Sequence, residues 1–258
     1  ADGLACTPLI QVARGEAALL PTGPHELREA LAWVAEYAAD AETYVCDLCP
    51  DSDDDLDPLD DVVTAVDSVA WYDHHQWDSA LAERVRTAGV DLAIGDSDEV
   101  CSADVTLAEL DHDFADQYAE LAAVTRDHDL WIRDDERSDD LADYAHWVDA
   151  ETYVETVLEH GPDLPAEAQE VLAERRIEKQ ALIEKAVERA RLREIGSVTV
   201  GVTYGRCSQN EVAERLREQG ADASVVVKPS GSASIRGTDA FERCHEVAAQ
   251  VEGGGHPK

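Results

Sequence analysis

The sequence of 258 residues contains no methionine, and only four of its 21 basic residues are lysine. It also has no apolar run that approaches the length of roughly 18 residues needed for a membrane-spanning helix, which excludes such a helix. No basic segment followed by an apolar one stands at its start, so it shows no secretory signal. These absences favour a cytoplasmic protein with no membrane partner. Because methionine is missing and the sequence stops at a glycine-rich segment, we expect the chain to be cut at both ends.

Positive charge is scarce as well, because 57 acidic residues give a formal net charge of −36. Acid spread over every expected helix is typical of a halophilic protein, since the Debye length at molar salt is only about 3 Å. An acidic face for a basic partner or for many metals would also explain the charge. We disfavour it, because the acidic residues are spread too evenly along the sequence to form one face. Nothing resembles a basic patch, so composition alone argues against a nucleic-acid ligand.

Cysteine is the remaining scarce residue, with six in the chain. Cys46 and Cys49 form a C-x-x-C pair, which is found in zinc half-sites and redox pairs. A zinc site needs a second pair at matching spacing, and the sequence has none. We therefore interpret the cysteines as small buried residues of a reduced cytoplasm.

The hydrophobic pattern of the first 130 residues predicts alternating helices and strands. Residues 25–39 place apolar side chains on one helical face, and 101–130 are mostly helical. Short apolar or β-branched runs at 43–48, 68–75 and 91–96 are typical of buried strands. This alternation predicts an α/β fold with a parallel sheet.

Two helices are expected next, over 138–160 and 165–194, the second long enough to join two domains. After Gly196 a smaller α/β unit begins. Its expected strands are 197–204, 223–229 and 232–237, and its expected helices are 208–220 and 239–251.

Candidate ligands follow the expected strands. Asp47 closes one strand, Asp73-His74-His75 closes the next, and Asp2 opens a helix at the N-terminus. In a parallel sheet the carboxyl ends share one edge, where ligands bind. A ligand set of carboxylate oxygens with one or two imidazole nitrogens suits manganese or magnesium. Asp47 alone would more often be a helix cap, and adjacent histidines on a strand would point to opposite faces.

These motifs resemble those of the DHH phosphoesterase superfamily, which includes RecJ-type exonucleases, oligoribonucleases and manganese-dependent pyrophosphatases. Asp73-His74-His75 matches its signature, and Asp2-Gly3 is similar to the end of its H-x-D-x-D-G motif, whose start would precede Ala1. Cys46-Asp47-Leu48 is similar to the second motif. The segment 126–131 (RDHDLW) is the candidate for the fourth.

The end of the chain resembles the associated DHHA1 domain. Gly253-Gly254-Gly255-His256 is similar to its GGGH motif, and Ser234-Ile235-Arg236-Gly237 to a segment upstream of it. Consecutive glycines allow backbone N–H groups to approach a phosphate closely. The resemblance implies a DHH domain over 1–160, a linker helix over 161–195 and a DHHA1 domain over 196–258, with the two domains facing a cleft.

The resemblance also implies the roles of individual residues. Two manganese ions, or magnesium, would be held by Asp2, Asp47, His74 and either Asp127 or Asp129, of which we prefer Asp127. His75 would lie beside the scissile phosphate, with Asp73 orienting the histidine pair. Substrate would be held by Arg236, Gly254, Gly255 and His256.

The implied activity is two-metal hydrolysis of short oligonucleotides or of single-stranded nucleic-acid ends. Alternatives are a phosphodiesterase for a small nucleotide, such as a cyclic dinucleotide or a 3′,5′-bisphosphate nucleotide, and a non-catalytic replication-associated homologue. A pyrophosphatase is disfavoured, because those enzymes carry a C-terminal domain without GGGH. RNA or DNA as substrate, and a homodimer, remain open. Because metals rather than a basic surface would hold the substrate, the −36 charge favours short substrates.

Overall fold

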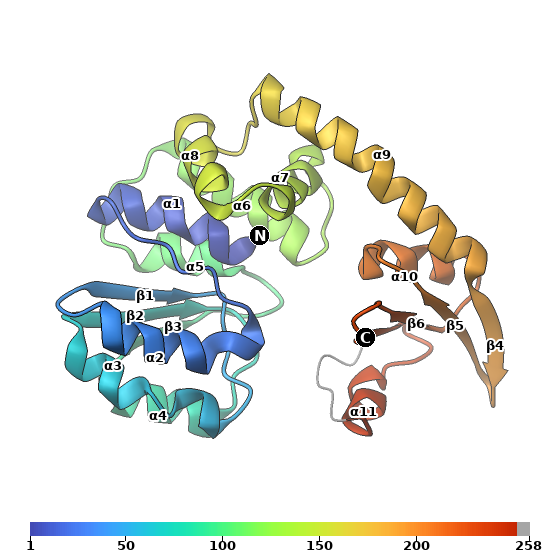
Figure 1. The fold of residues 1–258 in the computed structure, drawn as a ribbon, viewed down its shortest axis with the longest axis horizontal. Coiled ribbons are helices and arrows are strands. Elements are labelled where there is room, and N and C mark those ends of the chain that lie inside the picture. Colours follow the sequence, from blue (N-terminus) through green and yellow to red (C-terminus); the bar gives the residue numbers. More distant parts are fainter. Residues whose placement is uncertain (252–258) are drawn as a thin grey trace. The chain divides into compact units, whose positions relative to one another are not determined.

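The computed structural model describes residues 1–251, and the chain divides into two compact units, Ala1–Leu172 and Ala173–Lys258 (Figure 1). The expected linker, 161–195, contains this division, which falls inside a long helix, α9 (Ala166–Arg189). None of the described helices is both long and apolar enough to cross a membrane.

The first unit is built on a three-stranded parallel sheet in the order β1-β2-β3. Its strands are β1 (Glu42–Cys46), β2 (Ser68–Asp73) and β3 (Asp91–Ile94). β2 and β3 lie within the predicted segments and β1 begins one residue before its own, and the predicted parallel α/β arrangement is confirmed. Because the strands are parallel, the residues that follow β1 and β2 emerge at the same edge of the sheet.

Helices cover both faces of this sheet (Figure 1). One face packs against α2 (Leu27–Tyr37), α3 (Leu59–Ala65) and α4 (Ser79–Thr87), together with the short 3-10 helix Asp53–Leu56. A second 3-10 helix, Pro24–Glu26, precedes α2. On the other face lie α1 (Asp2–Arg14) and α5 (Ser102–Glu109). Beyond these two, α6 (Asp116–Asp129), α7 (Glu136–Trp147) and α8 (Ala150–His160) form a further layer (Figure 1).

Side-chain alternation along β2 divides the hydrophobic core into two layers. Trp71 is fully buried in the layer with α2 and α3, whereas its neighbour Tyr72 is buried in the layer with α1 and α6. Val45 of β1, which pairs with Trp71, joins the first layer. A strand with helices on both faces must be apolar at consecutive positions, which explains the continuous run that the sequence shows at β2.

The prediction of one helix over 138–160 is wrong, because α7 and α8 are separate helices. The chain leaves the helical conformation at Val148 and Asp149, whose φ/ψ angles are extended. The Asp149 carboxylate then accepts a 2.9 Å hydrogen bond from the Thr152 amide and caps α8. In a sequence so rich in aspartate, one capping aspartate carries no distinguishing signal.

The prediction of a helix over 165–194 is also wrong at its end. α9 ends at Arg189, and Arg191–Ile195 forms a strand, β4, that pairs antiparallel with β5 (Val198–Tyr204). Gly196, with φ of 65°, makes the turn between them. Arginine, leucine and glutamate are good helix formers, so the local signal favours helix until tertiary pairing overrides it.

The second unit is a four-stranded mixed sheet in the order β4-β5-β6-β7. Parallel strands β5 and β6 (Ala223–Val227) are joined through α10 (Gln209–Glu218), and β7 (Ala233–Gly237) is antiparallel to β6. α10 buries Val212 and Leu216. The last helix, α11, is Cys244–Ala249, which is shorter than the predicted 239–251.

The two units differ sharply in charge, contrary to the expected even spread. The first unit holds 44 acidic and seven basic residues, a formal charge of −37. The second holds 13 acidic and 14 basic residues, a formal charge of +1. The acidity therefore belongs to the first unit, and two thirds of the basic residues belong to the smaller second one.

Candidate metal centre

Asp47 follows β1 directly and adopts a left-handed conformation, with φ of 59°. Its backbone amide still donates to the carbonyl of Tyr72 on β2, at 3.1 Å, so the strained residue is fixed at the edge of the sheet. The amide of Gly3 donates a 2.8 Å hydrogen bond to Asp47 Oδ2. A Cβ on Gly3 would lie only 3.0 Å from Cβ of Asp47, so glycine permits this close approach of α1 to β1.

Asp2 lies at the start of α1 and is almost completely buried. Its two carboxylate oxygens accept hydrogen bonds from the backbone amides of Ser102, at 2.6 Å, and Ala103, at 2.9 Å. These amides belong to the first turn of α5, where N–H groups have no partner within the helix. The carboxylate of one helix therefore caps another, and this contact fixes the Asp2 side chain.

His74 lies at the centre of the carboxylates. Its Nε2 is 3.2 Å from Asp129 Oδ2 and 3.8 Å from both Asp2 Oδ2 and Asp47 Oδ1. The residue is 7% exposed, and its other ring nitrogen has no hydrogen-bond partner among the described residues. Three elements distant in sequence, α1, β1 and α6, thus bring carboxylates to one buried imidazole.

The structure places Asp129 beside His74, and not the preferred candidate Asp127. Residues two apart on a helix are separated by about 200°, so one of the two must point away from the sheet edge. Asp127 Oδ1 accepts a 2.9 Å hydrogen bond from the amide of Asp134, and its backbone carbonyl accepts from Ile132. Asp127 thus stabilises the turn after α6.

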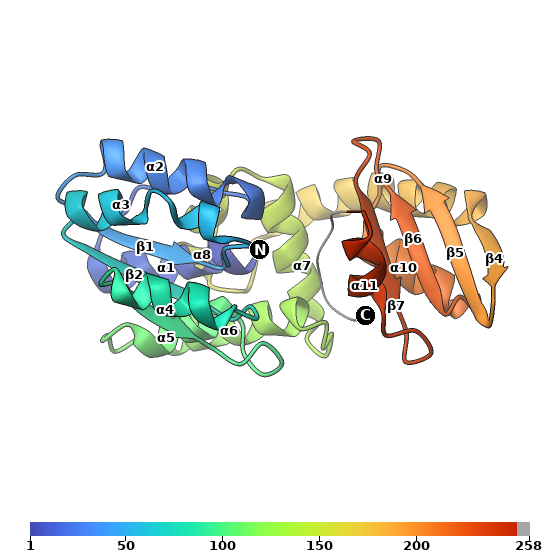
Figure 2. The ribbon, with the colours of Figure 1, turned by 90° about the horizontal axis from the view of Figure 1, so that it is seen from below.

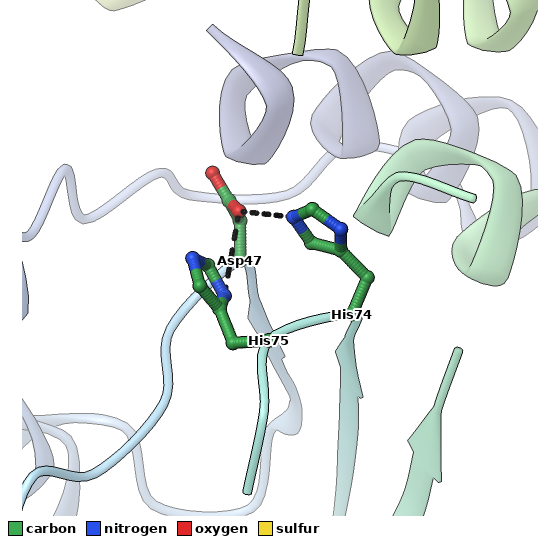
Figure 3. A group of neighbouring side chains, drawn as sticks. All are labelled: Asp47, His74 and His75. Carbon is green, nitrogen blue, oxygen red and sulfur yellow. Dashed lines mark ion pairs between the residues drawn. The ribbon is translucent and has the colours of Figure 1, made fainter. Parts of the chain in front are cut away.

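His75 turns to the same side as His74, contrary to the expected opposite orientation. β2 ends at Asp73, so the alternation of a strand no longer applies to the histidines. Figure 3 shows both rings directed at Asp47, and their centroids lie 4.8 Å apart. His75 Nδ1 is 4.0 Å from Asp47 Oδ1.

Asp73 holds His75 in place. Its Oδ1 lies 2.7 Å from Nδ1 of His75, and its Oδ2 accepts a 2.7 Å hydrogen bond from the indole N–H of Trp77. Asp73 is fully buried, so both carboxylate oxygens depend on these partners.

The electrostatics separate the carboxylates into two kinds. Burial, together with the negative charges of Asp47 and Asp129, raises the pKa of Asp2 to about 8. Burial and Asp129 likewise raise the pKa of Asp47. Burial also acts on Asp73, but its hydrogen bond to His75 and the charge of that ring outweigh burial and lower the pKa of this carboxyl.

The same hydrogen bond raises the pKa of His75 to about 9, against the opposing effect of burial, with the charges of Asp73 and Asp47 adding to the rise. His75 is therefore an imidazolium at neutral pH, and Asp73 its counter-ion. Asp2 and Asp47, by contrast, are carboxylates held together with too little positive charge nearby.

The side chains form two groups with the spacing of a metal site. The ligand atoms of Asp47, His74 and His75 lie within 4.8 Å of one another, and so do those of Asp2, His74 and Asp129. Carboxylate oxygens with imidazole nitrogen suit manganese or magnesium. A divalent cation would also remove the repulsion that raises the pKa values of Asp2 and Asp47. The donor set therefore fits the expected metals.

Sequence reasoning missed Ser102, which contacts three of the site carboxylates. Besides its amide bond to Asp2, its fully buried hydroxyl lies 3.4 Å from Asp47 Oδ1 and 3.5 Å from Asp73 Oδ1. A serine near the start of a helix is an ordinary capping residue. The sequence therefore contains no signal that could have identified it.

Other predicted residues lie away from this centre. Arg236 is on β7 in the second unit, where its Nε donates to Asn210 Oδ1 at 3.2 Å. Gly254, Gly255 and His256 lie outside the described residues. Cys46 and Cys49 are free thiols, as are the other four cysteines, and Cys46 lies 3.9 Å from the hydroxyl of Thr106.

Fold and site together define an α/β protein with an acidic, histidine-containing candidate metal centre at the edge of a parallel sheet. No family model matches the chain, and no curated protein matches it. Among solved structures, it is similar to an uncharacterized protein from Helicobacter pylori G27, at 14% identity and a TM-score of 0.45. That match covers 100% of this chain and 88% of the other.

Proposed function

We propose that this protein is a divalent-metal-dependent phosphodiesterase of the DHH/DHHA1 type, acting on short oligonucleotides or single-stranded nucleic-acid ends. One observation carries the proposal: Asp2, Asp47 and Asp129 surround His74 Nε2 at distances of 3.2 to 3.8 Å. These residues come from α1, β1, α6 and β2, so neighbouring sequence does not account for their meeting. The resemblance of their motifs to that superfamily supplies the reaction class.

The first unit is suited to cations and not to a free anionic substrate. Its net charge is −37, and the centre itself contains Asp2, Asp47 and Asp129 against one histidine with a raised pKa. Two divalent cations held there would neutralise phosphate charge and make a water molecule more acidic. Asp2, Asp47, His74 and Asp129 are the residues that would hold them.

His75 is the residue that we assign to the substrate. Its side chain is 41% exposed, so it reaches solvent while His74 is buried. With one ring nitrogen bonded to Asp73 and a pKa raised to about 9, it remains a cationic donor at neutral pH. Such a donor can bind a phosphate oxygen and give a proton to the leaving oxygen.

Asp73 acts through His75 and does not itself touch the substrate. Because Trp77 holds its other oxygen, the carboxylate cannot rotate without losing a buried hydrogen bond. The pair thus presents the imidazolium in one orientation. This is the role expected of a carboxylate that is hydrogen-bonded to a histidine and orients its ring.

In the second unit we assign Arg236 to substrate phosphate, with Gly254, Gly255 and His256 of the GGGH-like motif. Among the described residues, the Arg236 guanidinium donates to the Asn210 side chain and to the Ile235 carbonyl. Neither is charged, so the positive charge of an exposed arginine is available for an anion.

The test is hydrolysis by the manganese-loaded full-length protein in molar KCl. Substrates are RNA of two to five nucleotides, single-stranded DNA of the same length, cyclic dinucleotides and a 3′,5′-bisphosphate nucleotide. We expect cleavage of the oligonucleotides, at least about a hundredfold loss with His74→Ala, and little change with the control His146→Ala.

The other outcomes separate the alternatives. Hydrolysis of only the cyclic or bisphosphate nucleotides would favour the small-nucleotide phosphodiesterase. Absence of all cleavage, with manganese binding shown by the loss of the free-ion paramagnetic resonance signal, would favour a non-catalytic homologue and overturn the proposal.

A further inference from the structure

Among the described residues of the second unit are arginines that form no ion pair with a carboxylate. In the first unit, six of the seven arginines form an ion pair with an acidic side chain. On β4, Arg191 and Arg193 are both exposed, and neither forms an ion pair within residues 1–251. The second unit holds 13 acidic and 14 basic residues, so these two exposed arginines give β4 a local positive charge that an external anion could bind.

Strand register places these arginines on one face of the sheet. Arg191 pairs with Val202 and Arg193 with Val200, so all four side chains lie on the same side. Gly201 lies on the other side, where an added Cβ would be 3.2 Å from Leu216 of α10. The arginines therefore lie on the face that α10 does not cover.

This face remains open over β4 and β5. Val202 is 38% exposed and Tyr204 is 62% exposed. Near β7, α11 lies against the same face, since a Cβ on Gly237 would be 3.1 Å from the sulfur of Cys244. Figure 2 shows α11 on the β7 side of the sheet, with β4 at its opposite edge.

Tyr204 and Arg189 form a stacked pair at one end of this face. The guanidinium carbon of Arg189 lies 5.1 Å from the centroid of the Tyr204 ring, and its NH1 donates to the Tyr204 carbonyl at 3.4 Å. The guanidinium adds positive charge beside the ring. An exposed aromatic ring supported by arginine is the arrangement on which unpaired bases stack.

We propose that the β4–β5 face, defined by Arg189, Arg191, Arg193, Val202 and Tyr204, binds single-stranded nucleic acid. A base stacks on Tyr204, and Arg191 and Arg193 bind phosphates of the same strand. The face is distinct from the Arg236 region, because Arg236 contacts Asn210 of α10 on the covered side of the sheet. The inference rests on the proposed function, since it names single strands as the substrate class.

Charge and chemistry together favour a strand over other occupants. An acidic protein would bind the arginines but would not need an exposed aromatic ring beside them. A duplex presents its bases stacked and paired, and so leaves none free for Tyr204. Stacking also persists at molar salt, where counterion release contributes little.

The test is fluorescence anisotropy of a labelled single-stranded oligodeoxythymidine with the full-length protein in EDTA, between about 0.5 and 2 M KCl. We expect Tyr204→Leu to weaken binding at least about fivefold, with the salt dependence unchanged. Arg191→Gln with Arg193→Gln should weaken binding and reduce the slope of log K against log salt by about 1.4, or about 0.7 per phosphate.

The matched control is Arg215→Gln with Arg217→Gln, which removes the same charge from α10 and should leave binding within about twofold. Equal effects of the two double variants would reduce the result to net charge and overturn the proposal. Failure of the wild-type protein to bind the strand would also overturn it. So would β4–β5 variants that change the sedimenting mass of the protein but not its affinity for the strand. A change in mass would show that the face joins two copies of the chain.

Because EDTA prevents turnover, this experiment is independent of catalysis. If dinucleotides are hydrolysed but the β4–β5 variants bind strands as the wild type does, this inference fails and the proposed function stands. If binding follows the variants and no substrate is cleaved, the proposed function fails and the binding surface stands.

Discussion

The backbone amide of Ser102 donates a 2.6 Å hydrogen bond to the Asp2 carboxylate, 100 positions earlier in the chain. With the amide of Ala103 on the other oxygen, the start of α5 binds the side chain that begins α1. Asp2 would otherwise rotate away from Asp47 and Asp129, whose charges repel it. The fold thus opposes this repulsion with backbone amides, which keep the carboxylates together for a cation.

Asp47→Asn should weaken metal binding and stabilise the metal-free protein. The amide oxygen can still accept from Gly3, while the negative charge that helps burial to raise the pKa of Asp2 disappears. We expect the free energy of unfolding of the metal-free variant to be higher by roughly 1 kcal/mol. We also expect the variant to bind manganese at least about tenfold more weakly. Urea unfolding in EDTA and a manganese titration measure the two. Asp67→Asn, an exposed control, should change neither, and a destabilised metal-free Asp47→Asn would contradict the account.

Asp129→Asn and Asp127→Asn should fail in different ways. Asp129 faces His74, so its variant should lose manganese affinity at least about tenfold with little change in unfolding free energy. Asp127 accepts from the amide of Asp134, and Asn keeps the acceptor but loses the charge that strengthens this bond. Its variant should therefore lose roughly 1 kcal/mol of stability and retain metal binding. A manganese titration and urea unfolding of both proteins decide this. The reverse pattern would make Asp127 the ligand.

Gly3→Ala should separate α1 from β1. The new methyl would lie 3.0 Å from Cβ of Asp47, and neither backbone is free to move. We expect a loss of roughly 1 to 3 kcal/mol in unfolding free energy, with weaker manganese binding because Asp2 and Asp47 move apart. In the control Gly23→Ala, the nearest atom is the carboxylate end of Glu26, which can shift. If the two variants are equally stable in thermal unfolding, the close approach is not required.

Acid should weaken the contact between Asp135 and Arg137. The hydrogen bonds and charge of Arg137 outweigh burial and lower the pKa of Asp135 from its ordinary value of 3.8. The folded state therefore favours the carboxylate, and the stabilisation is present above about pH 4 and lost as pH falls through the lowered value. Asp135→Asn keeps an acceptor for the α7 cap but loses the charge. Its stability deficit, from urea unfolding, should be constant from pH 7 to about 5 and should shrink as the pH falls below about 4. A deficit independent of pH would show that charge is not involved.

Local pattern was sufficient for most of the first unit. Apolar runs ending in Asp47 and in Asp73-His74-His75 predicted both parallel strands and the shared edge at which their ends meet. Local pattern failed where long-range contacts decide conformation. β4 has the composition of a helix and is a strand because β5 is beside it.

The sequence by itself determined which residue types follow each strand and that the chain is strongly acidic. Only the tertiary structure decided that Asp129 and not Asp127 joins His74, because helix phase about α6 cannot be read without knowing which face meets the sheet. It likewise revealed Ser102, whose partners are between 29 and 100 positions away. It also showed that the acidity belongs to one unit, and that within residues 1–251 Arg191 and Arg193 of the other form no ion pair. The sequence shows which residue types are present and how far apart they lie along the chain, but how the helices and strands pack decides which of them come into contact.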